Sequence, residues 1–430
     1  MNSDRKRSPA AHIPEQRNEV GGKTMKDLTI TSKIVSEHDA NKPYHGLTMP
    51  IITGVTYTFD DTDDGREKHL AFGGDTGPEK EGYIYSRCAS PTVAELERRI
   101  AVLEGGDVAV GYASGMGAVC STVLTFIKCG DHLLTDTALY SGTFDLMTRK
   151  LPEFGVNVEQ IDMRNTEAVI AALKPNTAMV YCETITNPTM RMADIEEIAK
   201  AAHANNPDCV VVVDNTFATP LLYHPLEHGA DIVIESATKY INGHSDVLAG
   251  FAISDPKKAW KLNDCGRKYT TGAVLAPQEA YMVNRGLKTM PVRFRQHCEN
   301  AMKIAQWMES SGYFKKVYYP GLPSHPDYAI AQKELQGGFG GMISFEPMSF
   351  DIAKNMLDNL KLVNLAVSLG DVESLIEHPA SMTHSVLSEE ELAAAGLTKE
   401  LVRFSVGIED ADDLIEDLKQ AVEKAMEQCK

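Results

Sequence analysis

The chain has 430 residues, of which 43% are hydrophobic and 24% are charged, so it can bury a large core, and we expect two domains. Its 60 acidic and 42 basic residues give a net charge of −18, which disfavours nucleic acid as a partner because phosphate contacts need clustered lysine and arginine. Its eight cysteines form no C-x-x-C pair and no metal-type spacing, which predicts reduced thiols in the cytoplasm.

The N-terminus has no apolar segment of the secretory type, and no run of about 18 uncharged apolar residues occurs, so we expect no membrane association. Residues 1–25 are rich in Arg, Pro, Asn and Gly without a periodic apolar pattern, which predicts a flexible tail.

Helix-like and strand-like segments alternate from about residue 92. An amphipathic helix is predicted over residues 92–106, and a short apolar strand after it leads through a glycine-rich loop into a second helix. With helical stretches between them, further short apolar runs end on polar residues at 131–136, 178–184, 209–215 and 230–236. Apolar strands that alternate with helices are typical of a parallel sheet covered on both faces, so we predict an α/β fold.

The pattern changes beyond about Gly286. Long amphipathic helices are predicted at 295–310, 388–396 and 410–428, mixed with strand-like segments at 313–320, 340–347 and 401–407. This mixture predicts a smaller α+β domain. We therefore place a large domain at residues 90–290 and a C-terminal domain at residues 291–430.

Asp214 and Lys239 each follow a buried strand. In a parallel sheet, functional side chains gather at the carboxyl ends of the strands, so these two residues are expected at the same edge. Taken alone, Asp214 also fits a helix N-cap or a structural ion pair, and a single lysine after a strand is usually just solvated.

The residues around this lysine indicate a ligand. Ser236 and Thr238 flank Lys239, and residues 114–118 (SGMGA) place backbone N–H groups at a helix N-terminus, where an anion is favoured. Such a glycine loop also occurs as simple turn chemistry. Together these groups fit a ligand with a phosphate, an aldehyde for a lysine amine and a ring nitrogen for an aspartate. That ligand is pyridoxal 5′-phosphate (PLP).

The chain resembles the Cys/Met-metabolism family of PLP enzymes over residues 28–425, and within it the methionine γ-lyases and cystathionine γ-lyases. The resemblance rests on YIYSRCASPT (83–92), YASGMGA (112–118), LYSGTFDLM (139–147), ETITNPT (183–189), VVDNTFATP (212–220), SATKYINGHSDVLAG (236–250), LAVSLGDVESLIEHPASMTH (365–384) and LVRFSVGIED (401–410). It implies PLP-dependent fold type I, the aspartate aminotransferase-like architecture, with a mostly parallel large domain and a smaller α+β domain.

The resemblance also implies roles for individual residues toward the cofactor. Lys239 would condense with the PLP aldehyde and Asp214 would contact the pyridine nitrogen, which agrees with the interpretation of the strand ends. Tyr140 would stack on the ring and exchange protons. The phosphate would be held by Gly115, Met116, Ser236 and Thr238.

Further roles concern the substrate and a second subunit. Arg403 and Ser368 would bind the substrate α-carboxylate, with Asn187 near it; the arginine offers a bidentate fork that matches a carboxylate. Tyr85 and Arg87 would reach the phosphate of a neighbouring subunit. Residues 26–89 would then form an arm on that subunit, and the protein would be a homotetramer built from dimers that share active sites.

The implied reaction is γ-elimination of a sulfur amino acid, namely methionine, cystathionine or homocysteine, to 2-oxobutanoate, ammonia and a thiol. The alternative is a γ-replacement synthase that acts on an activated homoserine ester with the same lysine, aspartate and arginine. A catalytically silent protein of this fold would have lost one of these groups, and none is lost.

Some positions depart from the family pattern. Methionine γ-lyases typically carry a cysteine at the position of Gly142 and an acidic residue where this chain has Lys268 and Tyr269. Mammalian-type cystathionine γ-lyases usually have a glutamate just before the SLG motif, whereas this chain has Val367 there and resembles the methionine enzymes at this position. Gly142 and Tyr269 depart from the methionine γ-lyases, whereas Val367 departs from the mammalian-type cystathionine γ-lyases. The sequence therefore leaves the preferred substrate open.

His224 and His228 have the i, i+4 spacing of a metal-binding pair. They do not belong to an H-E-x-x-H arrangement, and no third ligand is evident in the sequence. We therefore expect no metal.

Overall fold

The computed structural model describes residues 19–20, 23–24, 28–36, 46–72, 82–385 and 388–430. Its larger sheet has seven strands, in the order β3 (Val108–Tyr112), β9 (Gly250–Ser254), β8 (Ile232–Glu235), β7 (Val210–Asp214), β6 (Thr177–Glu183), β4 (His132–Asp136) and β5 (Asn157–Ile161). β9 is antiparallel to β3 and β8, and the other neighbouring strands are parallel. The mostly parallel sheet predicted from the apolar runs is confirmed.

The central strands of this sheet are mostly apolar because both of its faces are covered, whereas the edge strand β5 (NVEQI) is more polar and partly exposed. In β7, Val211 and Val213 belong to one buried cluster, and Val210 and Val212 belong to another. The first cluster includes residues of α4 (Pro91–Glu104), α8 (Ile195–Asn205) and α11 (Pro277–Leu287), whereas the second includes residues of α5 (Gly115–Phe126). Helices on both faces explain the lack of period-two polarity in these strands.

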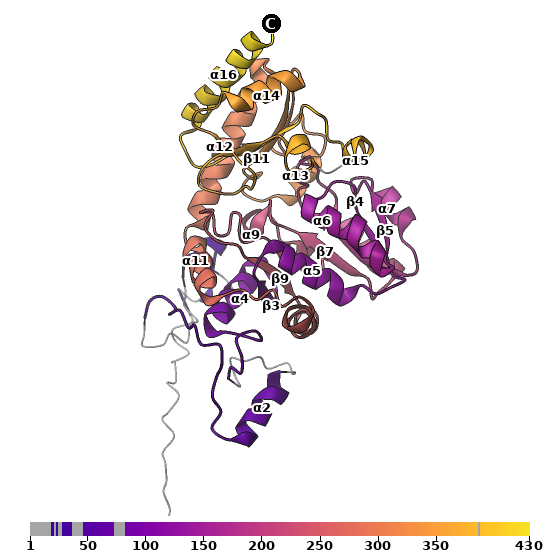
Figure 1. Ribbon diagram of the computed structural model, residues 1–430, viewed down its shortest axis with the longest axis vertical. Helices are drawn as coiled ribbons and strands as arrows, with labels where there is room; N and C mark the ends of the chain where they lie inside the picture. Colours follow the sequence, from indigo (N-terminus) through magenta and orange to yellow (C-terminus); the bar gives the residue numbers. More distant parts are fainter. Residues whose placement is uncertain (1–18, 21–22, 25–27, 37–45, 73–81, 386–387) are drawn as a thin grey trace, which may run out of the picture.

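A smaller sheet follows in the C-terminal part of the chain. Its five strands have the order β10 (Phe314–Tyr318), β11 (Met342–Pro347), β14 (Val402–Ser405), β13 (Leu375–Glu377) and β12 (Asn364–Leu365), and only the β12–β13 pair is parallel. Figure 1 shows it beside α12 (Met290–Ser311), α14 (Phe350–Asp358) and α16 (Ala411–Gln428). The predicted α+β region is therefore present.

One face of the smaller sheet packs on its helices, and the other face turns toward the larger sheet. Val402 and Phe404 belong to the core with α12, α14 and α16. Side chains alternate along a strand, so Arg403 points to the opposite face. From that face the Ser344 hydroxyl donates a 2.6 Å hydrogen bond to the Pro188 carbonyl oxygen. The alternation of side chains thus places Arg403 and Ser344 on the face of the smaller sheet that turns toward the larger sheet.

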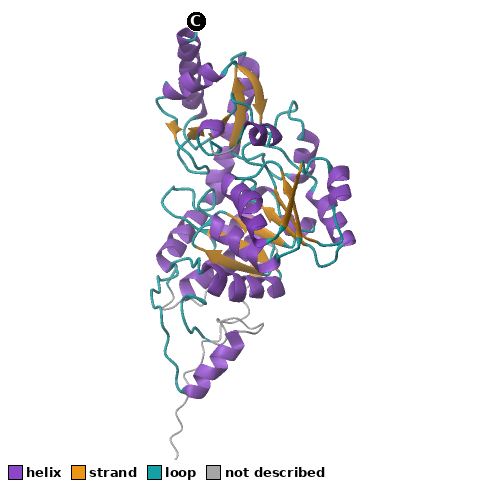
Figure 2. Cartoon of the chain, turned by 45° about the vertical axis from the view of Figure 1, so that its right-hand side comes forward, coloured by secondary structure: helices purple, strands orange, loops and turns teal. Residues whose placement is uncertain are grey.

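Shorter helices connect these parts or lie at the periphery. They are α1 (Ile30–Val35), α2 (Thr62–Phe72), α6 (Ser141–Asp145), α7 (Thr166–Ala172), α9 (Thr219–Leu222), α10 (Pro256–Lys261), α13 (Tyr328–Glu334) and α15 (Glu389–Ala394). Figure 2 shows α2 at the end of an extended loop, away from both sheets. Among the helices of the described ranges, none has the length and apolar character needed to cross a bilayer.

The predicted tail over residues 1–25 falls mostly outside the described residues. Within it the structure describes β1 (Glu19–Val20) and β2 (Lys23–Thr24), which pair in antiparallel fashion. The domain boundaries near residues 90 and 290 stay predictions.

A glycine in β9 lets the larger sheet approach the start of α5. A Cβ atom on Gly250 would lie 2.3 Å from the Ser114 carbonyl oxygen, and backbone cannot move away cheaply. We therefore expect Gly250→Ala to lower the free energy of unfolding by about 1–3 kcal/mol through overpacking. Chemical denaturation of the cofactor-free protein measures this, with Gly54→Ala as a control, because a Cβ atom on Gly54 would meet nothing within 4 Å in its own chain and its backbone is not left-handed. Equal stability of Gly250→Ala and wild type would contradict the close approach.

Candidate active site

A cavity of about 280 Å³ lies at the carboxyl ends of the parallel strands. Residues from both sheets contribute to its lining, because Asp214 ends β7 and Arg403 belongs to β14. It brings together all of the predicted site residues except Tyr85 and Arg87: Gly115, Met116, Tyr140, Asn187, Asp214, Ser236, Thr238, Lys239, Ser368 and Arg403.

The predicted phosphate end of the cavity lies at the N-terminus of α5. The Ser114 side chain caps this helix by accepting a hydrogen bond from the Gly117 N–H, 3.0 Å away. Gly115 lies directly against Ser236, since a Cβ atom there would be 2.8 Å from the Ser236 Oγ. The Thr238 hydroxyl oxygen accepts a 3.1 Å hydrogen bond from the Ala249 N–H. The glycine therefore keeps helix N–H groups and strand-end hydroxyls side by side.

Asp214 presents a carboxyl group to the cavity. Its Oδ1 accepts a 3.0 Å hydrogen bond from the Thr216 N–H, and its Oδ2 accepts a 3.4 Å bond from the Tyr181 hydroxyl. Burial raises the pKa of this carboxyl above its ordinary value, although both hydrogen bonds oppose the shift. A cationic partner in the cavity would restore the ionised form, and a protonated pyridine nitrogen has that property.

Lys239 also lines the cavity. Its Nζ donates a 2.6 Å hydrogen bond to the Ser368 Oγ. Burial, assisted by the positive charge of Arg403, lowers the pKa of this amine to about 8. Ser368 has a positive φ of 87°, which is uncommon for a residue with a side chain. In that conformation its hydroxyl contacts Lys239 while its carbonyl oxygen accepts a 2.8 Å bond from the Arg403 Nη2.

Arg403 is buried and faces the loop after β6. Its Nη1 donates a 2.8 Å hydrogen bond to the Asn187 Oδ1, and its Nη2 lies 2.9 Å from the Glu377 Oε1. Glu377 stands directly opposite Arg403 in the β13–β14 register. The Arg403 Nε and the Glu377 Oε2 are buried without a hydrogen-bond partner in the described chain. The guanidinium is thus held in place by three of its five N–H groups, and its Nε–H is not engaged by these neighbours.

Several residues of the site were missed by sequence reasoning, among them Glu183, Thr216 and Glu377. Glu183 and Thr216 line the cavity, and Glu377 supports Arg403. Glu183 ends a buried strand as Asp214 does, so the rule that selected Asp214 also selects it. Glu377 gave no comparable signal, since its strand has only three residues and its partner is distant in the sequence.

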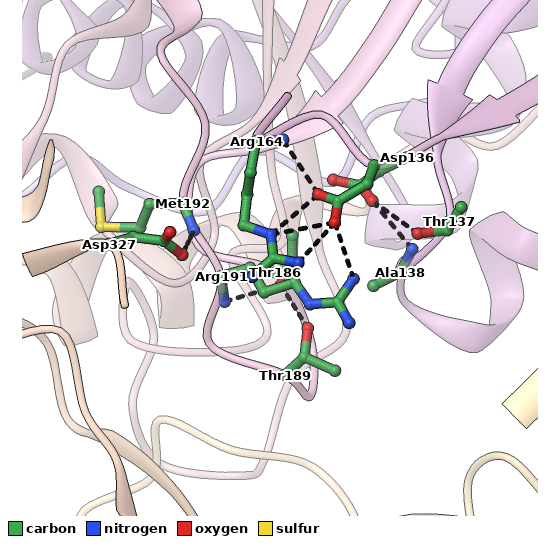
Figure 3. Close-up of polar contacts among 10 residues, drawn as sticks. Asp136, Thr137, Ala138, Arg164, Thr186, Thr189, Arg191, Met192 and Asp327 are labelled. Carbon is green, nitrogen blue, oxygen red and sulfur yellow. Dashed lines mark hydrogen bonds and ion pairs between the residues drawn. The ribbon is translucent and has the colours of Figure 1, made fainter. Parts of the chain in front are cut away.

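The loop after β6 carries Asn187 and is fixed along its length. Within it the Arg191 N–H donates to the Thr186 hydroxyl at 3.0 Å, and at its end the Met192 N–H donates to the Asp327 Oδ2 at 3.0 Å (Figure 3). Asp327 precedes α13, far along the chain. The loop is therefore tied to a segment near the smaller sheet as well as to its own strand.

Gly142 and Tyr269, which depart from the family pattern, lie in different surroundings. A Cβ atom on Gly142 would lie 2.8 Å from the Tyr140 Cε1 and 3.1 Å from the Met116 Sδ. Any side chain at this position would therefore shift the Tyr140 ring, which is 42% exposed and forms part of the cavity wall. Tyr269 is 66% exposed and does not line this cavity of its own chain.

Tyr85 and Arg87 lie on the surface near each other. The Arg87 guanidinium is 5.5 Å from the Tyr85 ring centroid, and its Nη1 donates a 2.6 Å hydrogen bond to the Lys268 carbonyl oxygen. Neither residue lines the cavity of its own chain. Their reach into a neighbouring subunit stays a prediction.

The His228 ring, the second residue of the i, i+4 pair with His224, is in contact with two other residues. The His228 ring stacks on Tyr223 with 4.7 Å between centroids, and its Nδ1 is 3.7 Å from the Glu196 Oε2. Among the residues that the structure describes, no group of three or more His, Cys, Asp or Glu side chains could hold a metal ion.

The residues of the cavity fit PLP. The helix N-terminus and hydroxyls suit its phosphate, the Lys239 amine suits its aldehyde, and the buried Asp214 carboxyl suits its ring nitrogen. These three groups come from separate segments of the larger sheet and its loops.

Comparisons with known proteins agree with this fit. The model of the Cys/Met metabolism PLP-dependent enzyme family matches residues 30–423. The chain is 48% identical over 382 residues to an L-methionine γ-lyase of Fusobacterium nucleatum subsp. polymorphum, covering 89% of this chain and 94% of that one.

Solved structures are also similar to this chain. A cystathionine γ-lyase from Lactobacillus plantarum, complexed with L-serine, has a TM-score of 0.84 and 36% identity, covering 92% of this chain and 98% of that chain. A putative O-acetylhomoserine (thiol)-lyase from Campylobacter jejuni, with N′-pyridoxyl-lysine-5′-monophosphate, has a TM-score of 0.84 and 32% identity, covering 92% and 100%. The chain therefore belongs to the family of Cys/Met metabolism PLP-dependent enzymes.

Proposed function

We propose that this protein is a PLP-dependent carbon–sulfur lyase that removes the γ-substituent of sulfur amino acids such as methionine. The products are 2-oxobutanoate, ammonia and a thiol. One observation carries the proposal: Ser368 contacts the Lys239 amine with its hydroxyl and the Arg403 guanidinium with its carbonyl oxygen. An amino acid whose carboxylate contacts Arg403 then has its α-carbon beside the Lys239 amine.

Lys239, Asp214 and the N-terminal end of α5 would hold the cofactor, and Tyr140 would cover its ring. When bound, PLP supplies an electron sink that stabilises negative charge on the carbon atoms of the substrate. In the reaction Lys239 removes the proton from the α-carbon. Its pKa of about 8 leaves a useful fraction of the amine neutral near physiological pH.

The γ-substituent faces the mouth of the cavity. Leu248 and Val367 line this mouth and are 65% and 51% exposed, so they offer apolar contacts to a thioether. Tyr140 stands at the same wall, where its phenol can donate a proton to the leaving sulfur. Similarity to L-methionine γ-lyases favours methionine among the candidate substrates.

The competing candidate is γ-replacement on an activated homoserine ester. It uses the same residues, and the similarity to a putative O-acetylhomoserine (thiol)-lyase favours it. A glycine at position 142, which leaves the Tyr140 ring where it is, is compatible with either reaction.

We propose further that the protein forms a homotetramer of dimers with shared active sites. The predicted arm exposes large apolar side chains on the isolated chain, including Leu47 at 83%, Val55 at 50% and Leu70 at 65%. Such a series is more typical of an interface than of a free surface. Tyr85 and Arg87 belong to the same segment and would complete the phosphate site of the partner.

The cytoplasm is the proposed compartment. All eight cysteines are free thiols, and several of them are buried. A reducing environment keeps thiols in this state.

Substrate preference can be measured directly. Given L-methionine alone, the PLP-loaded protein should form 2-oxobutanoate and methanethiol, and Lys239→Ala should abolish both this turnover and the visible absorption of the bound cofactor. Normal turnover by Lys239→Ala would refute the assignment. If methionine is inert with the cofactor bound, cystathionine and homocysteine are tested next. Thioether formation from O-acetylhomoserine and a thiol, without 2-oxobutanoate, would indicate the replacement enzyme.

Cofactor loading should depend on pH. Only the neutral amine attacks an aldehyde, so the rate of PLP loading into the cofactor-free protein should rise as the pH passes through about 8 and then level off. Stopped-flow absorbance measures this rate. In Arg403→Gln the nearby positive charge is lost, so the midpoint should move to higher pH. A wild-type midpoint at the pKa of a solvated lysine would contradict the burial of this amine.

Shared active sites can be tested with hybrids. Lys239→Ala and Arg87→Ala chains are expected to be poorly active alone. Co-expression should restore about a quarter of the wild-type sites, because half of the dimers are hybrids and each hybrid has one intact site. Hybrids of Lys239→Ala and Asp214→Ala serve as the control, since those residues act in the same chain. Failure of the first pair to regain activity would contradict sharing through Arg87.

A further inference from the structure

We propose that Glu183 is a positioning residue that fixes the ring-covering tyrosine and the carboxylate-binding asparagine relative to each other. The inference rests on the proposed function, because it assigns Tyr140 to the cofactor and Asn187 to the substrate end. Sequence reasoning gave Glu183 no role, although it ends β6 at the floor of the cavity.

The Glu183 carboxylate bridges two backbone N–H groups. Its Oε1 accepts a 2.7 Å hydrogen bond from the Tyr140 N–H, and its Oε2 accepts a 2.8 Å bond from the Asn187 N–H. Glu183 itself is only 5% exposed. Tyr140 immediately precedes α6, and Asn187 lies in the loop after β6, so one side chain connects two separate loops.

The bridge continues into the substrate end of the site. The Asn187 Oδ1 accepts a 2.8 Å bond from the Arg403 Nη1, and the Arg403 Nη2 donates to the Ser368 carbonyl oxygen at 2.8 Å. Lys239 then donates to the Ser368 hydroxyl at 2.6 Å. A continuous series of hydrogen bonds therefore runs from Tyr140 through Glu183 to Lys239. The far end of the Asn187 loop is fixed independently by the bond between Met192 and Asp327 (Figure 3).

A carboxylate at this position is costly. Glu183 stands next to Asp214 in the β6–β7 register, and burial together with the charge of Asp214 raises the pKa of Glu183. The two N–H donors act in the opposite direction. A glutamine would relieve the repulsion but has one oxygen, so its NH₂ group would face one of the two N–H donors. Both oxygens of Glu183 are engaged by backbone, which suits a positioning role rather than proton transfer.

The test measures binding of a ligand that cannot react at its γ-carbon. L-Norleucine has the shape of methionine with a methylene in place of sulfur and therefore lacks a leaving group. Its dissociation constant is obtained from the change in visible absorption of the PLP-loaded protein, and ring orientation is followed by visible circular dichroism. For Glu183→Gln we expect the dissociation constant to rise roughly tenfold to a hundredfold, together with an altered dichroism.

Glu334→Gln is the matched control. Glu334 is a buried carboxyl in α13, 3% exposed, outside the cavity lining, so its substitution should leave both readouts unchanged. If Glu183→Gln does not fold, Glu183→Asp keeps the charge but is too short to span both N–H groups, and it should show the same loss. A folded, PLP-loaded variant at position 183 with wild-type norleucine binding and dichroism would overturn the proposal. Norleucine binding requires no elimination, so this assay can be read whether or not the protein is a lyase. The proposed function has its own test: a wild-type protein inert toward methionine, cystathionine and homocysteine would refute it.

Discussion

The burial of charged side chains around one cavity is the constraint on which this structure depends. Arg403 and Glu377 form an ion pair whose side chains are 4% and 1% exposed, and Glu183 and Asp214 end adjacent strands nearby. Removing one partner of a buried pair costs about 3–5 kcal/mol, because the other charge remains unpaired. Arg403 and Glu377 therefore each depend on the other, whereas Glu183 and Asp214 depend on the hydrogen bonds that their carboxyl groups accept.

The two sheets satisfy this constraint in different ways. The larger sheet is mostly apolar along its central strands and places polar groups of the site where these parallel strands end, at Glu183, Asp214 and the segment around Lys239. The smaller sheet instead uses strand alternation, which sends Val402 and Phe404 into the helical core and Arg403 toward the cavity. The cofactor end and the substrate end of the site thus arise from separate folding rules.

The predictable part of the fold follows from these rules. Apolar runs that end on polar residues are enough to locate β4, β6, β7 and β8 and to place Asp214 and Lys239 at one edge of the sheet. Arg403 was assigned only through resemblance, because a strand of four residues does not reveal which sheet it faces. The role of Glu377 could not be predicted, because it depends on the strand register that places this residue opposite Arg403. The roles of the site residues, and those of the terminal segments, stay predictions.

The long helix α12 has a mechanical consequence. It begins beside the larger sheet, where Met290 and Phe294 belong to the core of that sheet, and it ends in the core of the smaller sheet with Ile304 and Met308. It therefore connects the core of the larger sheet, whose strand ends carry Asp214 and Lys239, with the core of the smaller sheet, which carries Arg403. A substitution that bends this helix would alter the distance between amine and guanidinium without touching either. Alleles that impair turnover can accordingly lie far from any reacting atom.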